Sequence, residues 1–340
     1  MARRLVICCD GTWNTRTKTP TNVIKTARAI APIAPDGTTQ VVFYDEGVGT
    51  SGGTLERLTG GAFGTGLAEN VLDTYLFLLH NYAPGDDIYL FGFSRGAYTA
   101  RSVVGMIRKC GLLHKHHADR LIEAYELYRK RDDTPDMPAA EHFRASYSRS
   151  PIPIKFVGVW DTVGSLGVPI DLPFRILSRR KHEFHDCKPS SSIEFAYQAL
   201  AIDERRGPFR PTLWEQQPHA RKQTLEQVWF VGVHMDIGGG HKRSSLSDIA
   251  LLWMKEKAEE TGLAFDEKYL RSALAPDALA ERHESRTSFY RLLPAFVRPI
   301  GDWPAAREAV HESALQRFHE LDAYSPRNLA RYIDSSDESA

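Results

Sequence analysis

Five short runs of continuous apolar residues constrain the fold of this chain more than any other feature. The runs do not alternate between apolar and polar residues, which is typical of strands buried on both faces of a parallel sheet. Each run ends in a polar or glycine-rich turn, and helical patterns follow between them. This alternation of strands and helices predicts an α/β domain whose sheet is mostly parallel and flanked by helices. The runs lie in the segments RRLVICCDG, TQVVFYDEG, DIYLFGFS, PIKFVGVWDT and QVWFVGVHMD, at residues 3–11, 39–47, 87–94, 153–162 and 227–236.

Polar residues whose side chains could take part in catalysis or binding lie at the carboxyl ends of these runs. In open α/β sheets, ligands bind in the crevice outside the carboxyl ends of the strands. We therefore expect the strand-end residues to converge on one crevice. They are Asp10, Asp45, Ser94, Asp161 and His234.

The composition is that of an ordinary globular protein, with 340 residues, 42% of them hydrophobic and 25% charged. A net charge of zero argues against a nucleic-acid partner and against strong attraction to anionic membranes. The four cysteines lack CxxC spacing, so we expect free thiols in a reducing compartment. No apolar stretch approaches the roughly 18 residues of a membrane span, and the N-terminal run is too short for a signal peptide. These features predict a cytoplasmic protein.

The segment 165–225 departs from the strand–helix alternation. It contains VPIDLPFRILSRRKHEF and SSIEFAYQALAIDERR, the second of which has a helical pattern. We expect a helical cap or insertion near the active edge of the sheet, with a peripheral helical layer as an equal alternative. Residues 1–330 are expected to form a single catalytic domain, and residues 331–340 a disordered tail.

The string GFSRG at residues 92–96 has the form of a nucleophile elbow, in which a serine stands on a tight turn between a strand and a helix. An apolar strand precedes Ser94, and small, helix-compatible residues follow it. Side chains at Gly92 and Gly96 would obstruct the close approach of strand and helix. The sequence therefore predicts Ser94 as a nucleophile, the alternative being a structural serine in a turn.

A serine nucleophile needs a general base, and the base needs an acid to orient it. His234 is the favoured base because it ends a predicted strand and three glycines follow it closely. Asp161 is the favoured acid, with Asp236 and Asp248 as rivals. The chain order Ser94, Asp161, His234 is that of α/β-hydrolases.

An oxyanion hole would use the backbone N–H of Arg95 and a second N–H from the CDGTWN turn, at Gly11 or Thr12. Asp10, Asp45 and Asp236 are further candidates for the substrate site, although Asp10 is also suited to bracing its own turn by an Asx-type hydrogen bond. No ligand spacing is diagnostic of a metal, so neither a metal nor another cofactor is predicted.

Two other motifs match weakly. GVGTSG at residues 47–52 has the GxGxxG form, but no helix opens directly after it and no acid ends the following strand, so a glycine-rich active-site loop is favoured. ICCDGTW is similar to the start of haloacid-dehalogenase phosphatases, but Cys8 occupies the position of their nucleophilic aspartate.

The assembled motifs resemble the catalytic domains of type VI secretion phospholipase effectors of the Tle group, class one. The resemblance covers nearly the whole chain and rests on CDGTWN, GVGT, GFSRGAYTAR, GVWDTVGSLG, VGVHMDIGGGH, LSDIALLWM and VHESALQR. It implies an α/β-hydrolase fold and a triad of Ser94, Asp161 and His234. The chain departs from the family pattern at Met235, where serine is common, and at His241, where tyrosine is usual.

The resemblance implies a serine esterase that degrades lipids, with phospholipids as substrates and transient contact with a membrane surface. It also raises export by a specialised secretion system as an alternative to a cytoplasmic location. Two other functions stay open: an esterase or thioesterase with no lipid role, and a non-catalytic interaction module on a hydrolase fold. The oligomeric state is not predicted.

Overall fold

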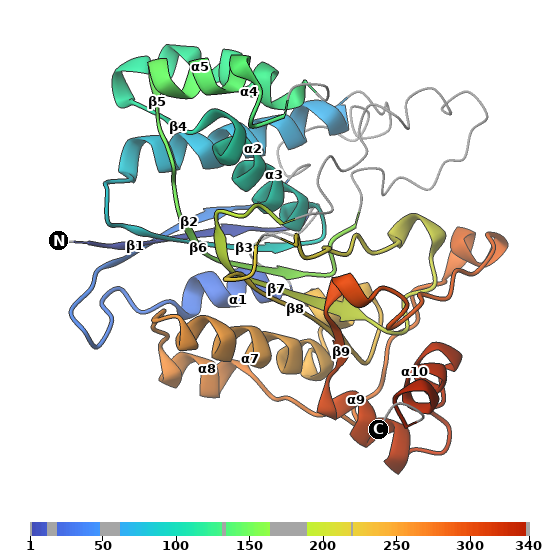
Figure 1. The fold of residues 1–340 in the computed structure, drawn as a ribbon. Coiled ribbons are helices and arrows are strands. Elements are labelled where there is room, and N and C mark those ends of the chain that lie inside the picture. Colours follow the sequence, from blue (N-terminus) through green and yellow to red (C-terminus); the bar gives the residue numbers. More distant parts are fainter. Residues whose placement is uncertain are drawn as a thin grey trace.

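A seven-stranded sheet forms the centre of the computed structural model, which describes residues 2–11, 19–47, 62–130, 134–163, 189–218 and 220–337. The strand order is β2-β1-β3-β6-β7-β8-β9, and every neighbouring pair is parallel (Figure 1). The strands are β1 (Arg4–Cys9), β2 (Gln40–Asp45), β3 (Asp87–Phe93), β6 (Ile154–Trp160), β7 (Ile193–Ala201), β8 (Thr224–Phe230) and β9 (Glu308–Val310). A separate antiparallel pair joins β4 (Leu112–Leu113) to β5 (Ser148–Arg149).

The parallel α/β fold predicted from the five apolar runs is confirmed, since β1, β2, β3 and β6 lie within four of those runs and β8 overlaps the fifth. The inner strands β1, β3, β6 and β8 are mostly buried, as their continuous apolar sequences require, whereas the edge strand β2 is only partly buried. For example, all six residues of β1 are buried between β2 and β3. Parallel strands place their carboxyl ends at one edge, and that edge carries the residues described below.

The helical pattern assigned to SSIEFAYQALAIDERR is wrong. This segment forms β7, which pairs along its length with β6 and β8 near the middle of the sheet. Its alanines favour a helix in isolation, but burial between two strands overrides that preference. The boundaries predicted for a cap at 165–225 are therefore also wrong, because they enclose a strand of the main sheet. Residues 165–188, the first part of that segment, lie outside the described residues.

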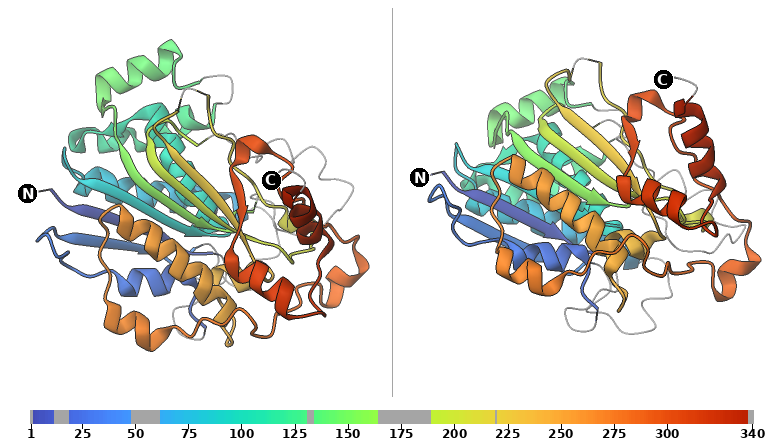
Figure 2. Two further views of the ribbon diagram at one scale, coloured as in Figure 1. Left: turned by 60° about the horizontal axis from the view of Figure 1, so that its bottom comes forward. Right: turned by 90° about the horizontal axis from the view of Figure 1, so that it is seen from below.

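Helices cover both faces of the sheet (Figure 1). Residues of α2 and α3 join one face of the sheet in one hydrophobic cluster, and residues of α1 and α7 join the other face in a second cluster. Figure 2 shows the red helices α9 and α10 beside the β9 edge. The helices are α1 (Asn22–Ala29), α2 (Ala62–Asn81), α3 (Arg95–Cys110), α4 (Leu121–Arg129), α5 (Pro138–Tyr147), α6 (His234–Gly238), α7 (Ser245–Glu260), α8 (Glu267–Ala273), α9 (Glu312–Glu320) and α10 (Arg327–Asp337).

Helix α10 corrects the prediction of a disordered tail from residue 331. The helix continues to Asp337, and residues 338–340 lie outside the described part of the chain. Leu329 is fully buried, and the Asn328 side chain donates hydrogen bonds to the carbonyl oxygens of Ile202 and Arg298, both at 3.0 Å. These contacts anchor a polar sequence that would otherwise be a poor helix. Among the described residues, no helix is long and apolar enough to cross a membrane.

A buried ion pair joins α1 to α7 beneath the sheet. Lys25 Nζ lies 2.6 Å from Asp248 Oδ1, and both side chains are almost fully buried. Ser244 Oγ accepts from Lys25 at 3.2 Å and donates to Asp248 Oδ2 at 3.1 Å, while the Ala275 N–H donates to the same oxygen at 3.0 Å. Asp248, a rival for the catalytic acid in the sequence analysis, is thus engaged with Lys25.

We expect Lys25→Met to lower the free energy of unfolding by about 3–5 kcal/mol, because it leaves the Asp248 carboxylate buried without its cation. Urea denaturation measures this change. The matched control is Lys155→Met, since the Lys155–Glu194 pair is largely exposed and should contribute less than about 1 kcal/mol. An equal effect of the two variants would contradict the prediction.

Candidate active site

Ser94 stands on a strained turn between β3 and α3. Its φ of 57° and ψ of −116° are rare for a residue with a side chain, and only 7% of its surface is exposed. Its N–H donates to the Trp160 carbonyl at 3.1 Å, which fixes the turn against the end of β6. The strand–turn–helix context that a nucleophile elbow requires is therefore present around Ser94.

The glycines beside Ser94 allow this turn to pack tightly. A Cβ on Gly92 would lie 2.6 Å from the backbone of Ala97, so strand and helix could not approach as they do. A Cβ on Gly96 would lie 2.0 Å from the Cys9 carbonyl oxygen and 2.5 Å from that of Asp10. These contacts agree with the expectation from sequence that both positions exclude side chains.

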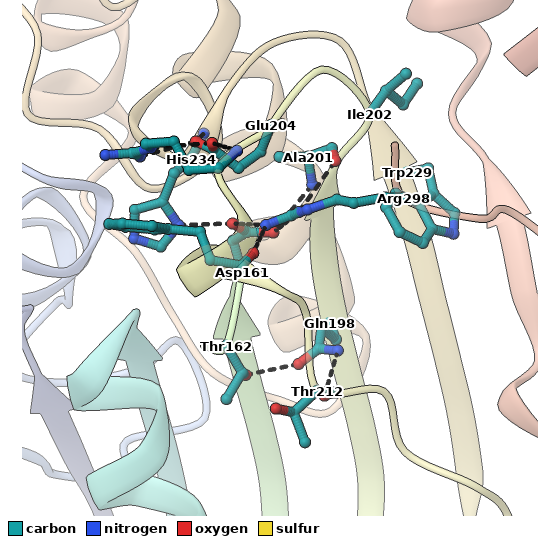
Figure 3. Close-up of polar contacts among 12 residues, drawn as sticks. Asp161, Thr162, Gln198, Ala201, Ile202, Glu204, Thr212, Trp229, His234 and Arg298 are labelled. Carbon is teal, nitrogen blue, oxygen red and sulfur yellow. Dashed lines mark hydrogen bonds and ion pairs between the residues drawn. The ribbon is translucent and has the colours of Figure 1, made fainter. Parts of the chain in front are cut away.

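Asp161 and His234 meet at the same edge of the sheet (Figure 3). Asp161 directly follows β6, is fully buried, and has a φ of 41°. His234 begins α6 four positions after the last residue of β8, Phe230, and its Nδ1 lies 2.6 Å from Asp161 Oδ2. The rings of Phe93 and Phe209 pack against the imidazole, with centroids 4.7 and 5.0 Å away. Because Phe93 directly precedes Ser94, these contacts bring the base close to the predicted nucleophile.

Arg298 holds the other side of the Asp161 carboxylate. Its Nη1 lies 2.6 Å from Oδ1 and its Nη2 lies 3.0 Å from Oδ2, and the Ala201 N–H also donates to Oδ1, at 3.1 Å. The guanidinium is fully buried and donates to the carbonyl oxygens of Ala201 and Phe209 as well. Burial alone would raise the pKa of Asp161, but the charge of Arg298 and the hydrogen bond from His234 lower it well below its usual value. The carboxylate is therefore ionised throughout the physiological range.

Glu204 is a second buried carboxylate near the imidazole. Its Oε2 accepts from the His234 N–H at 3.3 Å, and its Oε1 accepts from Ser285 Oγ at 2.9 Å. Arg206 pairs with Glu204 at 2.8 Å and lies over the ring of Phe209. These groups fix the backbone at the start of α6 and the aromatic ring that packs on His234.

Sequence reasoning missed Arg298 and Glu204. Arg298 was visible as a single arginine in the apolar segment LLPAFVRPIG, where a lone cation needs a buried anion. Nothing in the sequence showed that this anion is Asp161, 137 residues earlier. Nothing in the charged segment DERR distinguished Glu204 from its neighbours as a residue of the site.

The structure does not show every hydrogen bond that the predicted catalytic residues would need. Within the described residues, no hydrogen bond links the Ser94 hydroxyl to the His234 ring. Catalytic hydrogen bonds of this kind often tighten only in the substrate complex. Asp236 turns away from the imidazole, since its Oδ1 lies 2.5 Å from Nδ1 of His283.

The CDGTWN turn after β1 contains two of the predicted oxyanion donors, the N–H groups of Gly11 and Thr12. The Gly11 N–H donates to Asp10 Oδ1 at 2.7 Å, so the assignment of this N–H to an oxyanion hole is not supported. Asp10 braces its turn, because its Oδ2 also accepts from the hydroxyls of Thr21 and Tyr44 at 2.6 and 2.8 Å. Thr12 lies outside the described residues. Arg95 begins α3, where an N–H has no acceptor within the helix.

Asp45 ends β2 next to this turn, and its backbone carbonyl accepts from the Asp10 N–H at 2.9 Å. Burial, followed by the neighbouring charges of Asp73 and Asp10, raises the pKa of Asp45 to about 6. Asp10 and Asp45 therefore lie together at the β1–β2 end of the same sheet edge.

A solved structure shares this fold. The structure of the Tle1 effector bound to the VgrG spike from the type 6 secretion system matches with a TM-score of 0.51 and 16% identity, over 82% of this chain and 78% of that chain. An uncharacterized protein from Pseudomonas aeruginosa matches with a TM-score of 0.44 and 16% identity, over 78% of this chain and 46% of that chain.

Sequence comparisons give the family. The uncharacterized protein YEL023C of Saccharomyces cerevisiae is 30% identical over 242 residues, which are 65% of this chain and 34% of the yeast protein. The chain thus spans about a third of the length of that relative. A family model described as the catalytic domain of the Tle1-like phospholipase effectors of type VI secretion matches residues 3–257. The chain therefore belongs to the Tle1-like family of phospholipase effector catalytic domains, which supports a hydrolase function of the lipase kind.

Proposed function

We propose that this protein is a serine hydrolase that cleaves carboxylic acyl esters, with phospholipids as its substrates. The observation that carries the proposal is the buried hydrogen bond between Asp161 and His234 beside the strained turn of Ser94. In this assignment Ser94 is the nucleophile, His234 the general base and Asp161 the acid that orients it.

The hydrogen bond to Asp161 occupies Nδ1 of His234, so Nε2 is left to exchange a proton with Ser94. The Ser94 oxygen attacks the ester carbonyl while its proton passes to Nε2. Collapse of the tetrahedral intermediate releases the alcohol, which takes this proton, and leaves an acyl group on Ser94. A water molecule then attacks the acyl group, again losing its proton to Nε2, and Ser94 is regenerated as the carboxylic acid departs.

The amino end of α3 is suited to stabilise the oxyanion. The N–H of Arg95 opens this helix directly after Ser94, and the helix dipole favours negative charge at that end. The Gly11 N–H is excluded as a partner by its bond to Asp10. We assign the backbone N–H of Arg95 as one oxyanion donor. We propose that the second donor comes from the loop that includes Thr12.

Family membership supports the choice of a lipid substrate. It also extends the proposal to how the protein is exported and where it acts. The related effector was solved bound to a VgrG spike, and we propose carriage of this chain by a comparable secretion apparatus. Contact with a membrane surface would then be transient.

We expect Ser94→Ala to lower the turnover of short-chain p-nitrophenyl esters by about 10⁴-fold or more, because the attacking oxygen is lost. Steady-state kinetics measure this loss, and labelling of the parent by a fluorophosphonate probe should disappear with it. The control is Ser102→Ala, which removes a buried hydroxyl from the same helix without touching the turn.

Retention of parental turnover by Ser94→Ala would refute the serine mechanism. If the folded parent protein does not react with the fluorophosphonate probe at Ser94, the result would instead indicate a non-catalytic interaction module. Comparison of monomeric esters with phospholipid vesicles then separates a lipase from an esterase with no lipid role.

Arg298 is a positioning residue in this mechanism, because it acts through Asp161. We expect Arg298→Lys to lower kcat by about tenfold to a hundredfold with little change in KM, since a lysine cannot hold both carboxylate oxygens and the imidazole would shift. The control is Arg317→Lys, a buried arginine that donates to two backbone carbonyl oxygens away from Asp161. Equal kcat values for Arg298→Lys and the parent would remove Arg298 from the mechanism.

A further inference from the structure

We propose that Asp236, His241 and His283 bind one divalent transition-metal ion of the zinc type, at a site separate from the Ser94–His234–Asp161 constellation. The proposal rests on these three side chains alone and does not depend on the hydrolase mechanism. No residue of the proposed triad is among the ligands.

The three side chains converge from two distant parts of the chain. Asp236 lies in α6, His241 follows it in the glycine-rich turn, and His283 belongs to the segment between α8 and residue 288. One potential ligand atom from each residue lies within 4.8 Å of the other two. The imidazole rings of His241 and His283 stack at 3.7 Å between centroids, 13° from parallel. Among the described residues, this is the only such group of three or more potential ligands.

The backbone after α6 brings His241 back beside Asp236. Gly239 and Gly240 have φ values of 81° and 107°, which residues with side chains rarely adopt, and they reverse the chain after α6. Gly232 allows Asp236 to pack closely, because a Cβ there would lie 2.3 Å from the Cβ of Asp236. The proposed metal site therefore lies at helix α6, which begins at His234, and at the glycine turn that follows this helix.

The carboxylate of Asp236 is oriented as a metal ligand should be. It is 2% exposed, and its Oδ2 accepts from the backbone N–H groups of Val233 and His283 at 3.0 and 3.2 Å. These bonds fix the group and leave Oδ1 facing the His283 ring. Hydrogen bonds that orient a ligating carboxylate in this way are characteristic of metal sites.

The donor set selects the kind of ion. Two imidazoles and one carboxylate suit zinc and similar first-row ions, whereas calcium and magnesium prefer oxygen ligands throughout. Three protein ligands leave a fourth tetrahedral position for water.

Small side-chain movements would complete the site. Ligand atoms around a tetrahedral zinc lie about 3.3 Å apart, given bonds of about 2.0–2.2 Å. The Asp236–His283 contact of 2.5 Å would open by less than about 1 Å, and a rotation of the half-buried His241 ring would bring its nitrogen inward. The bound ion would then fasten the segment around His283 to α6.

The test is titration of the chain, purified without a polyhistidine tag, with Zn²⁺ by calorimetry and with Co²⁺ by visible absorption. We expect one ion per chain, with the ligand-field absorption of tetrahedral Co²⁺. His241→Phe keeps a stacked ring but removes the ligand, so it should weaken binding at least about tenfold and abolish the increase in Tm that Zn²⁺ gives the parent. His241→Gln provides a second variant should the phenylalanine disturb folding.

The matched control is His116→Phe in the exposed histidine cluster, where His116 packs against His114 and His117. It should bind like the parent, as should Ser94→Ala, so failure of the ester-hydrolysis proposal leaves this one standing. The proposal is overturned if the parent binds no ion, if His241→Phe binds as tightly as the parent, or if only His116→Phe loses binding. In each of these cases the Asp236–His283 hydrogen bond and the ring stack are structural contacts only.

Discussion

The rest of the active edge depends on the charge of one buried side chain, the carboxylate of Asp161. A fully buried anion is costly unless it is paired and hydrogen-bonded, and this one receives bonds from His234, Arg298 and the Ala201 N–H. Each partner comes from a different element: α6, the segment before β9, and the end of β7. The requirement to satisfy one carboxylate therefore sets the relative positions of several segments that are far apart in the sequence.

Two backbone conformations at this edge are strained. Among the described non-glycine residues, positive φ angles occur at Ser94, Asp161 and Arg307. The strain at Ser94 is maintained by Gly92 and Gly96, which let α3 approach β3 and β1 more closely than any side chain would allow. The strain at Asp161 is maintained by its ion pair. Strained residues of this kind persist only where their surroundings hold them, and they are concentrated at functional sites.

The features that sequence predicted well are those that local chemistry determines. Continuous apolar runs gave five parallel strands, and the strand–turn–helix context placed Ser94, because both patterns are complete within a few residues. The strand β7 was missed because its alanines and polar residues become a strand only when β6 and β8 flank it. The Gly11 donor was misassigned for a related reason, since the competing acceptor is the side chain of the residue before it.

Arg298 could not be assigned from sequence because its partner Asp161 lies 137 residues earlier, and it changes the boundaries of the proposed catalytic unit. The family model matches residues 3–257, yet the cation that neutralises Asp161 comes from residue 298. The same later segment contributes His283, and the α10 residue Asn328 donates to the Arg298 carbonyl oxygen. A unit cut at residue 257 would keep Ser94, Asp161 and His234 but leave the Asp161 carboxylate buried without its guanidinium. The proposed functional unit therefore includes both the sheet and the C-terminal segment, because the buried Asp161 carboxylate meets its cation only there.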